Sequence, residues 1–228
     1  MVYNNVMRTK LADRLLPNYS KGEELFNFIS HLVGAVFGVI ALVLCIVKAY
    51  VNGNAAAVVT SIVYGLSVIL LYTMSAIYHG LSDGMAKRVM QVMDHCTIFV
   101  LIAGTYTPIA VCTLAKVNPW IGWGIFGFEW ALALVGIIFN AIDIKYFSKL
   151  SMFIMLLMGW AIVPFYKTLL QAVGTGGFWF ILSGGIVYSI GAALYAIGNK
   201  KTVMHCIFHV FVVVASILQF IAIFFYVL

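Results

Sequence analysis

Histidines at helical spacing are the residues in this sequence best suited to chemistry. His205 and His209 stand four residues apart in an apolar stretch, and Ser75 and His79 repeat that spacing at the end of another. Residues four apart share one helix face, so His205 and His209 can direct two imidazoles at one point. Asp94 precedes a third apolar stretch. Three neutral imidazoles with one open position describe a catalytic-type zinc site, and a nearby carboxylate could hold or deprotonate a water.

These residues also have structural interpretations. A single histidine in a membrane helix more often makes an interhelical hydrogen bond than binds a metal, and Ser75 could bond to its own helix backbone. His95 is rotated by about 100° from Asp94 on a helix, so we expect it to face elsewhere and to be structural. Glu129, near the middle of a stretch, and His31 are ionisable residues in apolar surroundings for which the spacing predicts no role.

Composition assigns the chain to the membrane. Of its 228 residues, 64% are hydrophobic and only 9% are charged, which is too apolar for a soluble domain of this length. A helix needs about 20 apolar residues to cross a bilayer. Seven stretches qualify: Leu25–Val47, Ala55–Tyr78, Cys96–Ala115, Trp120–Ala141, Leu150–Leu170, Phe178–Ile197 and Val203–Leu228.

We therefore expect an all-α polytopic membrane protein with one seven-helix domain over residues 25–228. Residues 1–24 are polar, without the apolar core of a cleavable signal peptide, and form a separate N-terminal segment. The four cysteines fall within or at the ends of spans, so no disulfide framework is indicated. The net charge of +6 does not indicate a nucleic-acid partner, because the basic residues are spread over the span ends.

Basic residues predict the orientation, since they favour the cytoplasmic side. Alternate connections carry ten on one side and three on the other. The ten are Arg8, Lys10, Arg14, Lys21, Lys87, Arg88, Lys145, Lys149, Lys200 and Lys201, and the three are Lys48, Lys116 and Lys167. The N-terminus, with residues 1–24, is then cytoplasmic and the C-terminus outside. The second span ends at the cytoplasm while the third and seventh begin there, so all five candidate site residues should meet in one leaflet.

Four stretches together resemble the hemolysin III branch of the progestin and adipoQ receptor family. They are Glu23–His31, Ser75–His79, Asp94–Phe99 followed by Ala103–Pro108, and His205–His209, and the similarity runs through nearly the whole chain. The resemblance implies a seven-helix bundle with a cytoplasmic N-terminus and an intramembrane zinc.

The same resemblance implies roles for individual residues. The zinc ligands map onto His79, His205 and His209, the water-holding aspartate onto Asp94, and a serine near the metal onto Ser75. The wider superfamily includes alkaline ceramidases, which hydrolyse a lipid amide. Bacterial members have been linked with lytic activity and with membrane-fluidity homeostasis.

Three functions follow as hypotheses. The first is zinc-dependent hydrolysis of an amide or ester bond in a membrane lipid, with Asp94 as the base and Ser75 steadying the water or the oxyanion. The second is a non-enzymatic lipid or fluidity sensor with structural zinc, and the third is a membrane-perturbing cytolysin. In each case the partner is a membrane lipid and the expected location is a bacterial plasma membrane.

Overall fold

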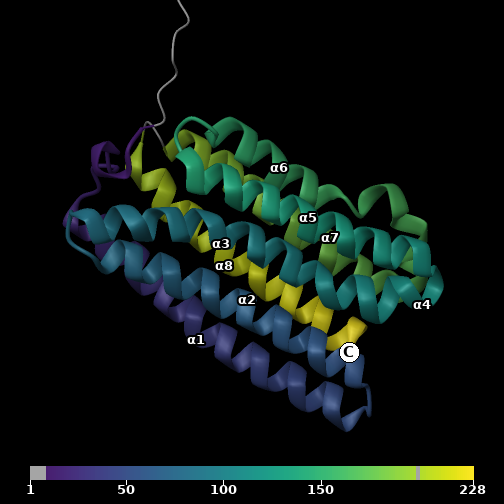
Figure 1. The fold of residues 1–228 in the computed structure, drawn as a ribbon. Coiled ribbons are helices and arrows are strands. Elements are labelled where there is room, and N and C mark those ends of the chain that lie inside the picture. The colour runs from purple at the N-terminus through teal and green to yellow at the C-terminus, as the bar shows by residue number, and fades with distance from the viewer. Residues whose placement is uncertain (1–8, 199–200) are drawn as a thin grey trace, which may run out of the picture.

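The computed structural model describes residues 9–198 and 201–228, so Arg8 and Lys200, used above to predict orientation, lie outside the described residues. Every regular element in the described ranges is helical (Figure 1). The α-helices are α1 Lys21–Val51, α2 Ala55–Gly80, α3 Met85–Ile109, α4 Ala115–Val117, α5 Pro119–Asp143, α6 Ser148–Trp160, α7 Tyr166–Gly198 and α8 Thr202–Ala222. Shorter turns are η1 Leu11–Asp13, η2 Ala110–Leu114, η3 Val163–Phe165 and η4 Ile223–Val227. The expectation of an all-helical chain is confirmed for these residues.

Polar caps explain where several long helices begin. The Ser20 side chain accepts from the Glu23 amide while Glu23 accepts from the Ser20 amide, a capping box that starts α1 four residues before the expected span. Asn54 caps α2, and Asn118 caps α5 with a proline at the first helical position. These caps satisfy amides that the first turn of a helix leaves unbonded.

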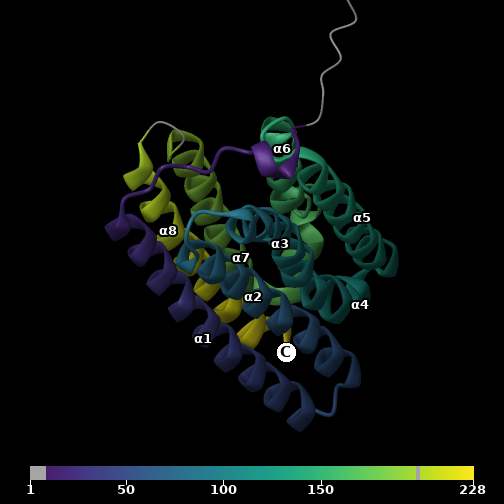
Figure 2. The same cartoon turned by 60° about the vertical axis from the view of Figure 1, so that its left-hand side comes forward.

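Small residues let the long helices pack closely, as is typical of membrane bundles. A Cβ atom on Gly34 of α1 would lie 2.4 Å from the Tyr72 ring of α2, and one on Gly136 of α5 would lie 2.3 Å from the Phe99 ring of α3. Helix α1 therefore lies along α2, and α5 along α3, while α8 packs against both α7 and α1 (Figures 1 and 2).

Two prolines interrupt regular helix, as their missing amides predict. Pro108 lies in the last turn of α3 and is followed by the π-helical turn η2. Pro164 lies in η3, a 3-10 turn between α6 and α7.

The described residues contain six stretches long and apolar enough to span a membrane, against the seven expected. The difference arises at Ser148–Gly198, which counts as one stretch although Gly174 interrupts it with a φ of 67°. Glycine adopts this conformation without strain. Trp160, before this break, donates to Ser189, after it, at 3.0 Å, so the two parts of the chain lie side by side.

The end of the bundle where α1 begins is called the proximal end, and the opposite one the distal end. Residues 9–20 form an N-terminal strap that runs across the proximal end from α6 to the start of α1 (Figure 2). At the distal end the Lys48 ammonium donates to the Phe224 carbonyl, and Asn52 donates to the Leu228 carbonyl at 2.8 Å, joining α1 to the end of α8 and η4.

Candidate metal centre

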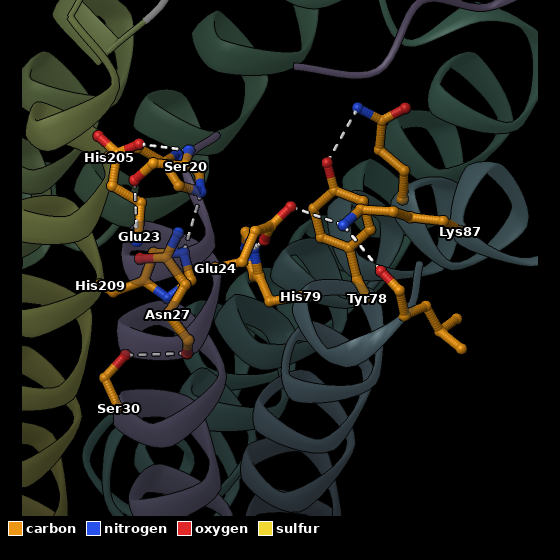
Figure 3. Close-up of polar contacts among 12 residues, drawn as sticks. Ser20, Glu23, Glu24, Asn27, Ser30, Tyr78, His79, Lys87, His205 and His209 are labelled. Atoms are coloured by element: carbon orange, nitrogen blue, oxygen red, sulfur yellow. Dashed lines mark hydrogen bonds and ion pairs between the residues drawn. The ribbon is translucent and has the colours of Figure 1, made fainter. Parts of the chain in front are cut away.

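Three buried histidines meet near the proximal end, as expected. His79 comes from the last turn of α2, and His205 and His209 come from the first two turns of α8. One ligand atom from each ring lies within 4.8 Å of the other two, and the residues are 3%, 7% and 1% exposed. The sequence prediction that these segments converge is confirmed, and Figure 3 shows the three rings grouped between α2 and α8.

The geometry of the group fits a single metal ion. The Nε2 atoms of His205 and His209 are 3.0 Å apart. Two nitrogens that each lie 2.0–2.1 Å from a tetrahedral zinc are separated by about 3.3 Å. The Nε2 atom of His79 is buried and has no hydrogen-bond partner among the described residues. A buried imidazole nitrogen without a partner, close to two others, is an arrangement that a cation would satisfy.

A carboxylate on α1 sets the orientation of His79. Glu24 Oε2 lies 2.6 Å from His79 Nδ1, and because a carboxylate only accepts, Nδ1 carries the proton. The Nε2 lone pair of His79 then points away from Glu24. Carboxylate–histidine pairs of this kind hold metal ligands in the correct tautomer and raise their basicity.

Lys87 of α3 pairs with the other oxygen of the Glu24 carboxylate. Its ammonium lies 2.6 Å from Glu24 Oε1 and donates to the Leu81 carbonyl at 2.9 Å (Figure 3). Lys87 is only 2% exposed. The sequence analysis treated it as one of the basic residues at a span end, whereas the structure buries it against Glu24.

Asp94 and Ser75 lie beside the three histidines. Both residues line a cavity that also receives His205 and His209. In the part of the chain that the structure describes, the group of mutually close ligand atoms contains the histidines without Asp94. The arrangement therefore places an acceptor in the same cavity as two of the three histidines.

This cavity measures about 430 Å³ and is mostly apolar away from the histidines. Its walls include residues of α8 from His205 to Gln219, a length of about 21 Å at 1.5 Å per residue. Three of its other lining residues, Leu156, Val163 and Tyr166, are 37%, 43% and 48% exposed on the outside of the bundle. The cavity thus joins a polar proximal end to a long apolar channel that reaches the bundle surface beside η3.

His95 departs from the expectation that it faces away from Asp94. It lines the same cavity, and its ring lies 6.0 Å from that of Tyr195. Its carbonyl accepts from Asn140, which in turn accepts from Ser151 at 2.6 Å. A helical rotation of 100° was too narrow a criterion, because the cavity is wide enough to be lined by neighbouring residues of α3.

Tyr19 is a site residue that the sequence analysis missed. Its ring stacks on His205 with centroids 5.1 Å apart and lies 5.7 Å from the His79 ring. Burial raises the pKa of the Tyr19 phenol well above its usual value, and the neighbouring Tyr195 and Glu24 raise it further, so the phenol stays neutral. No pattern marks Tyr19, but Glu24 could have been noticed as a carboxylate in the first turn of an apolar helix.

The two ionisable residues without a predicted role differ in position. The His31 ring stacks on His209 with centroids 3.8 Å apart and meets the edge of Tyr72, so it supports the cluster from α1. Glu129 is fully buried on α5, and neither of its carboxylate oxygens has a hydrogen-bond partner within the described ranges. It is not in the group of close ligand atoms found among the described residues.

Comparison with known proteins places the chain in a family. The model of the family described as "Haemolysin-III related" matches residues 19–220. "Hemolysin-3" of Bacillus cereus is 38% identical over 206 residues, covering 90% of this chain and 92% of the relative. The "Hemolysin-3 homolog" of Bacillus subtilis is 36% identical over 204 residues, covering 90% and 94%.

A more distant similarity extends to animals. The human "Monocyte to macrophage differentiation factor" is 23% identical over 173 residues, covering 72% of this chain and 69% of the relative. No solved structure matches the chain significantly. The family model spans the described site from Tyr19 to His209, and the chain is therefore a multi-pass membrane protein that belongs to the haemolysin-III related family.

Proposed function

We propose that this protein hydrolyses an amide or ester bond of a membrane lipid, using a zinc ion held by His79, His205 and His209. One observation carries the proposal. Three buried imidazoles have converging ligand atoms, and two of them, those of His205 and His209, line the polar end of a long apolar cavity. A cavity of this shape suits a molecule with a long hydrocarbon part and a polar part that must reach the histidines.

The proposal includes a topology. Residues 148–198 cross the membrane twice, with the break at Gly174 near the far side, giving seven crossings in all. The proximal end, where Arg88, Lys145 and Lys149 gather, faces the cytoplasm of a bacterial cell, and the C-terminus lies outside. Contacts of Gly177 with Tyr226 at the distal end and of Gly198 with His205 at the proximal end support two crossings within this stretch.

The protein's own residues have distinct tasks in the reaction. Zinc, when bound, would supply Lewis acidity and a nucleophilic water at neutral pH. Asp94 accepts the proton of the attacking water and returns it to the leaving nitrogen or oxygen. Ser75, which lines the same cavity as Asp94, orients the Asp94 carboxylate or steadies the oxyanion. Glu24 holds the protonated nitrogen of His79 away from the reaction centre.

The lipid enters from the membrane. Its hydrocarbon chain occupies the apolar part of the cavity, entering beside η3 and the start of α7, where Val163 and Tyr166 are both lining and exposed. The scissile bond then lies at the polar end beside Asp94. Exclusion of water from the apolar part strengthens the electrostatic interactions at the histidines.

Two other functions stay as alternatives that the experiment below separates. A lipid sensor with structural zinc needs a closed metal shell, whereas Asp94 stands outside the group of close ligand atoms. The printed name of the Bacillus relatives suggests lysis of membranes. A lytic pore would need a polar lining, and the cavity is apolar along most of its length.

The test replaces Asp94 by asparagine. The three imidazoles remain, so the variant should keep its zinc, while lipid turnover should fall by about 10²–10⁴-fold because asparagine cannot accept a proton at neutral pH. Lipid profiles of cells that carry the wild type, Asp94→Asn or no protein measure this. Asp83→Asn is the control, because Asp83 is exposed and lies in the connection between α2 and α3. If Asp94→Asn and wild-type cells share one profile that differs from that of cells without the protein, hydrolysis is excluded and the sensor takes its place.

A further inference from the structure

The N-terminal strap is fastened across the proximal end at three points. The Thr9 amide donates to the Asp143 carboxylate at 3.1 Å, at the end of α5. Arg14 is buried and donates to the Ile142 carbonyl at 2.7 Å, and its own carbonyl accepts from Arg88 at 2.9 Å. These bonds tie the strap to α5 and α3, on the side of the bundle away from α1.

The other end of the strap enters α1 directly above the histidines. Ser20 caps α1, and Tyr19, the residue before it, lays its ring on His205 with an interplanar angle of 28°. The same ring is tilted against His79. Tyr19 therefore covers two of the three histidines from the proximal side, and both its position and its direction are set by bonds on either side of it.

The two ends of the site differ in the space that they leave for a ligand. The apolar cavity reaches the bundle surface at Leu156, Val163 and Tyr166, which are large apolar or aromatic residues with exposed fractions of 37–48%. At the proximal side an aromatic ring stands over the histidines themselves. A hydrocarbon chain can therefore enter through the opening at these residues, whereas the Tyr19 ring limits the size of a polar group bound beside the histidines.

We propose that Tyr19 is a specificity-determining residue: held by the strap, its ring covers His79 and His205 from the proximal side and admits only lipids whose polar end is compact. The part of this proposal that concerns lipids rests on the proposed function. The part that concerns closure does not, because it requires only that removing the ring or freeing the strap exposes the residues beneath.

A native cysteine reports on closure without metal or turnover. Cys206 follows His205, is 9% exposed and lies near Tyr19. In a protein whose other three cysteines are alanine, labelling of Cys206 by a polar, membrane-impermeant maleimide should be about tenfold faster in Tyr19→Ala and in Arg14→Ala. Both substitutions remove about one net hydrogen bond or one ring contact. A loss of that size shifts the equilibrium between the closed and open positions of the strap by about tenfold.

Two variants serve as controls for the labelling. Tyr19→Phe keeps the ring, and Lys10→Ala removes a cation from an exposed position of the strap, so both should label at the wild-type rate. Arg14→Ala leaves every residue of the histidine site intact, so it tests closure even where Tyr19→Ala does not fold. Equal labelling rates in the wild type, Tyr19→Ala and Arg14→Ala would overturn the closing role.

Bound lipid tests the selectivity. Mass spectrometry of the lipids that copurify with each protein should show larger polar ends in Tyr19→Ala than in the wild type, with Tyr19→Phe unchanged. An identical set of bound lipids in Tyr19→Ala would overturn the specificity role. If the Asp94 experiment excludes hydrolysis, both outcomes stay readable, since neither labelling nor lipid retention depends on turnover.

Discussion

Glu24 connects the metal centre to a buried cation, and replacing it by glutamine separates those two roles. Its carboxylate meets His79 Nδ1 and the Lys87 ammonium, each at 2.6 Å. A glutamine of the same shape has one acceptor oxygen, so it can serve one partner and not both. Loss of a carboxylate that orients a ligand weakens metal binding by about 10–100-fold. We expect that loss in Glu24→Gln, equivalent to about 1.4–2.7 kcal/mol.

The same substitution should destabilise the fold through Lys87. Removing one partner of a buried ion pair costs about 3–5 kcal/mol. Lys87 keeps its bond to the Leu81 carbonyl, and the Glu24 side chain is 19% exposed, so we expect the low end, about 3 kcal/mol. The double variant Glu24→Gln/Lys87→Met removes the unpaired cation. It should regain most of the stability without regaining zinc affinity.

Two measurements on the purified protein in lipid nanodiscs distinguish the effects. Competition with a chromogenic chelator gives zinc affinity, and thermal unfolding of the metal-free protein gives stability. Zinc affinity in Glu24→Gln equal to that of the wild type would refute the orienting role of Glu24. Recovery of affinity together with stability in the double variant would show that the metal responds to folding and not to the carboxylate.

Three further predictions concern the metal, the topology and the packing. The wild type should carry about one zinc per chain by elemental analysis, as a three-histidine site implies. His209→Ala should lose most of this zinc and His95→Ala should keep it. Full zinc retention in His209→Ala would exclude the assignment. A reporter fused after Leu228 should be active only outside the cell, and activity in the cytoplasm would reverse the proposed orientation. Gly122→Ala should destabilise the bundle by about 1–3 kcal/mol, because the new Cβ would lie 2.4 Å from a backbone nitrogen of α4. Gly124→Ala is the control, because a Cβ there meets open space. Superimposable melting curves of the two variants would contradict this prediction.

The helices could be predicted from the sequence because apolar length is a local property. The expected interval between Leu170 and Phe178 contains Gly174, where the structure breaks the helix. The convergence of His79 with His205 and His209 also followed, since helical spacing and the direction of each span are enough to bring the segments to one end.

The surroundings of the histidines could not be predicted in the same way. Lys87 looks like an interfacial cation, and only the tertiary fold shows that α1 brings Glu24 over it. Tyr19 lies outside every apolar stretch, and hydropathy gives no information on where such a segment rests. His95 was misplaced because helix geometry gives a direction for a side chain but not the width of the cavity it meets.

The distribution of the cluster along the chain has a consequence for biosynthesis. Glu24 and His79 belong to the first two helices, and His205 and His209 belong to α8, which follows all the others. A ribosome therefore delivers one ligand early and two late. The nascent protein cannot assemble the three-histidine group while α8 is still being translated, so the group must form after α8 has entered the bilayer and docked against α1 and α7.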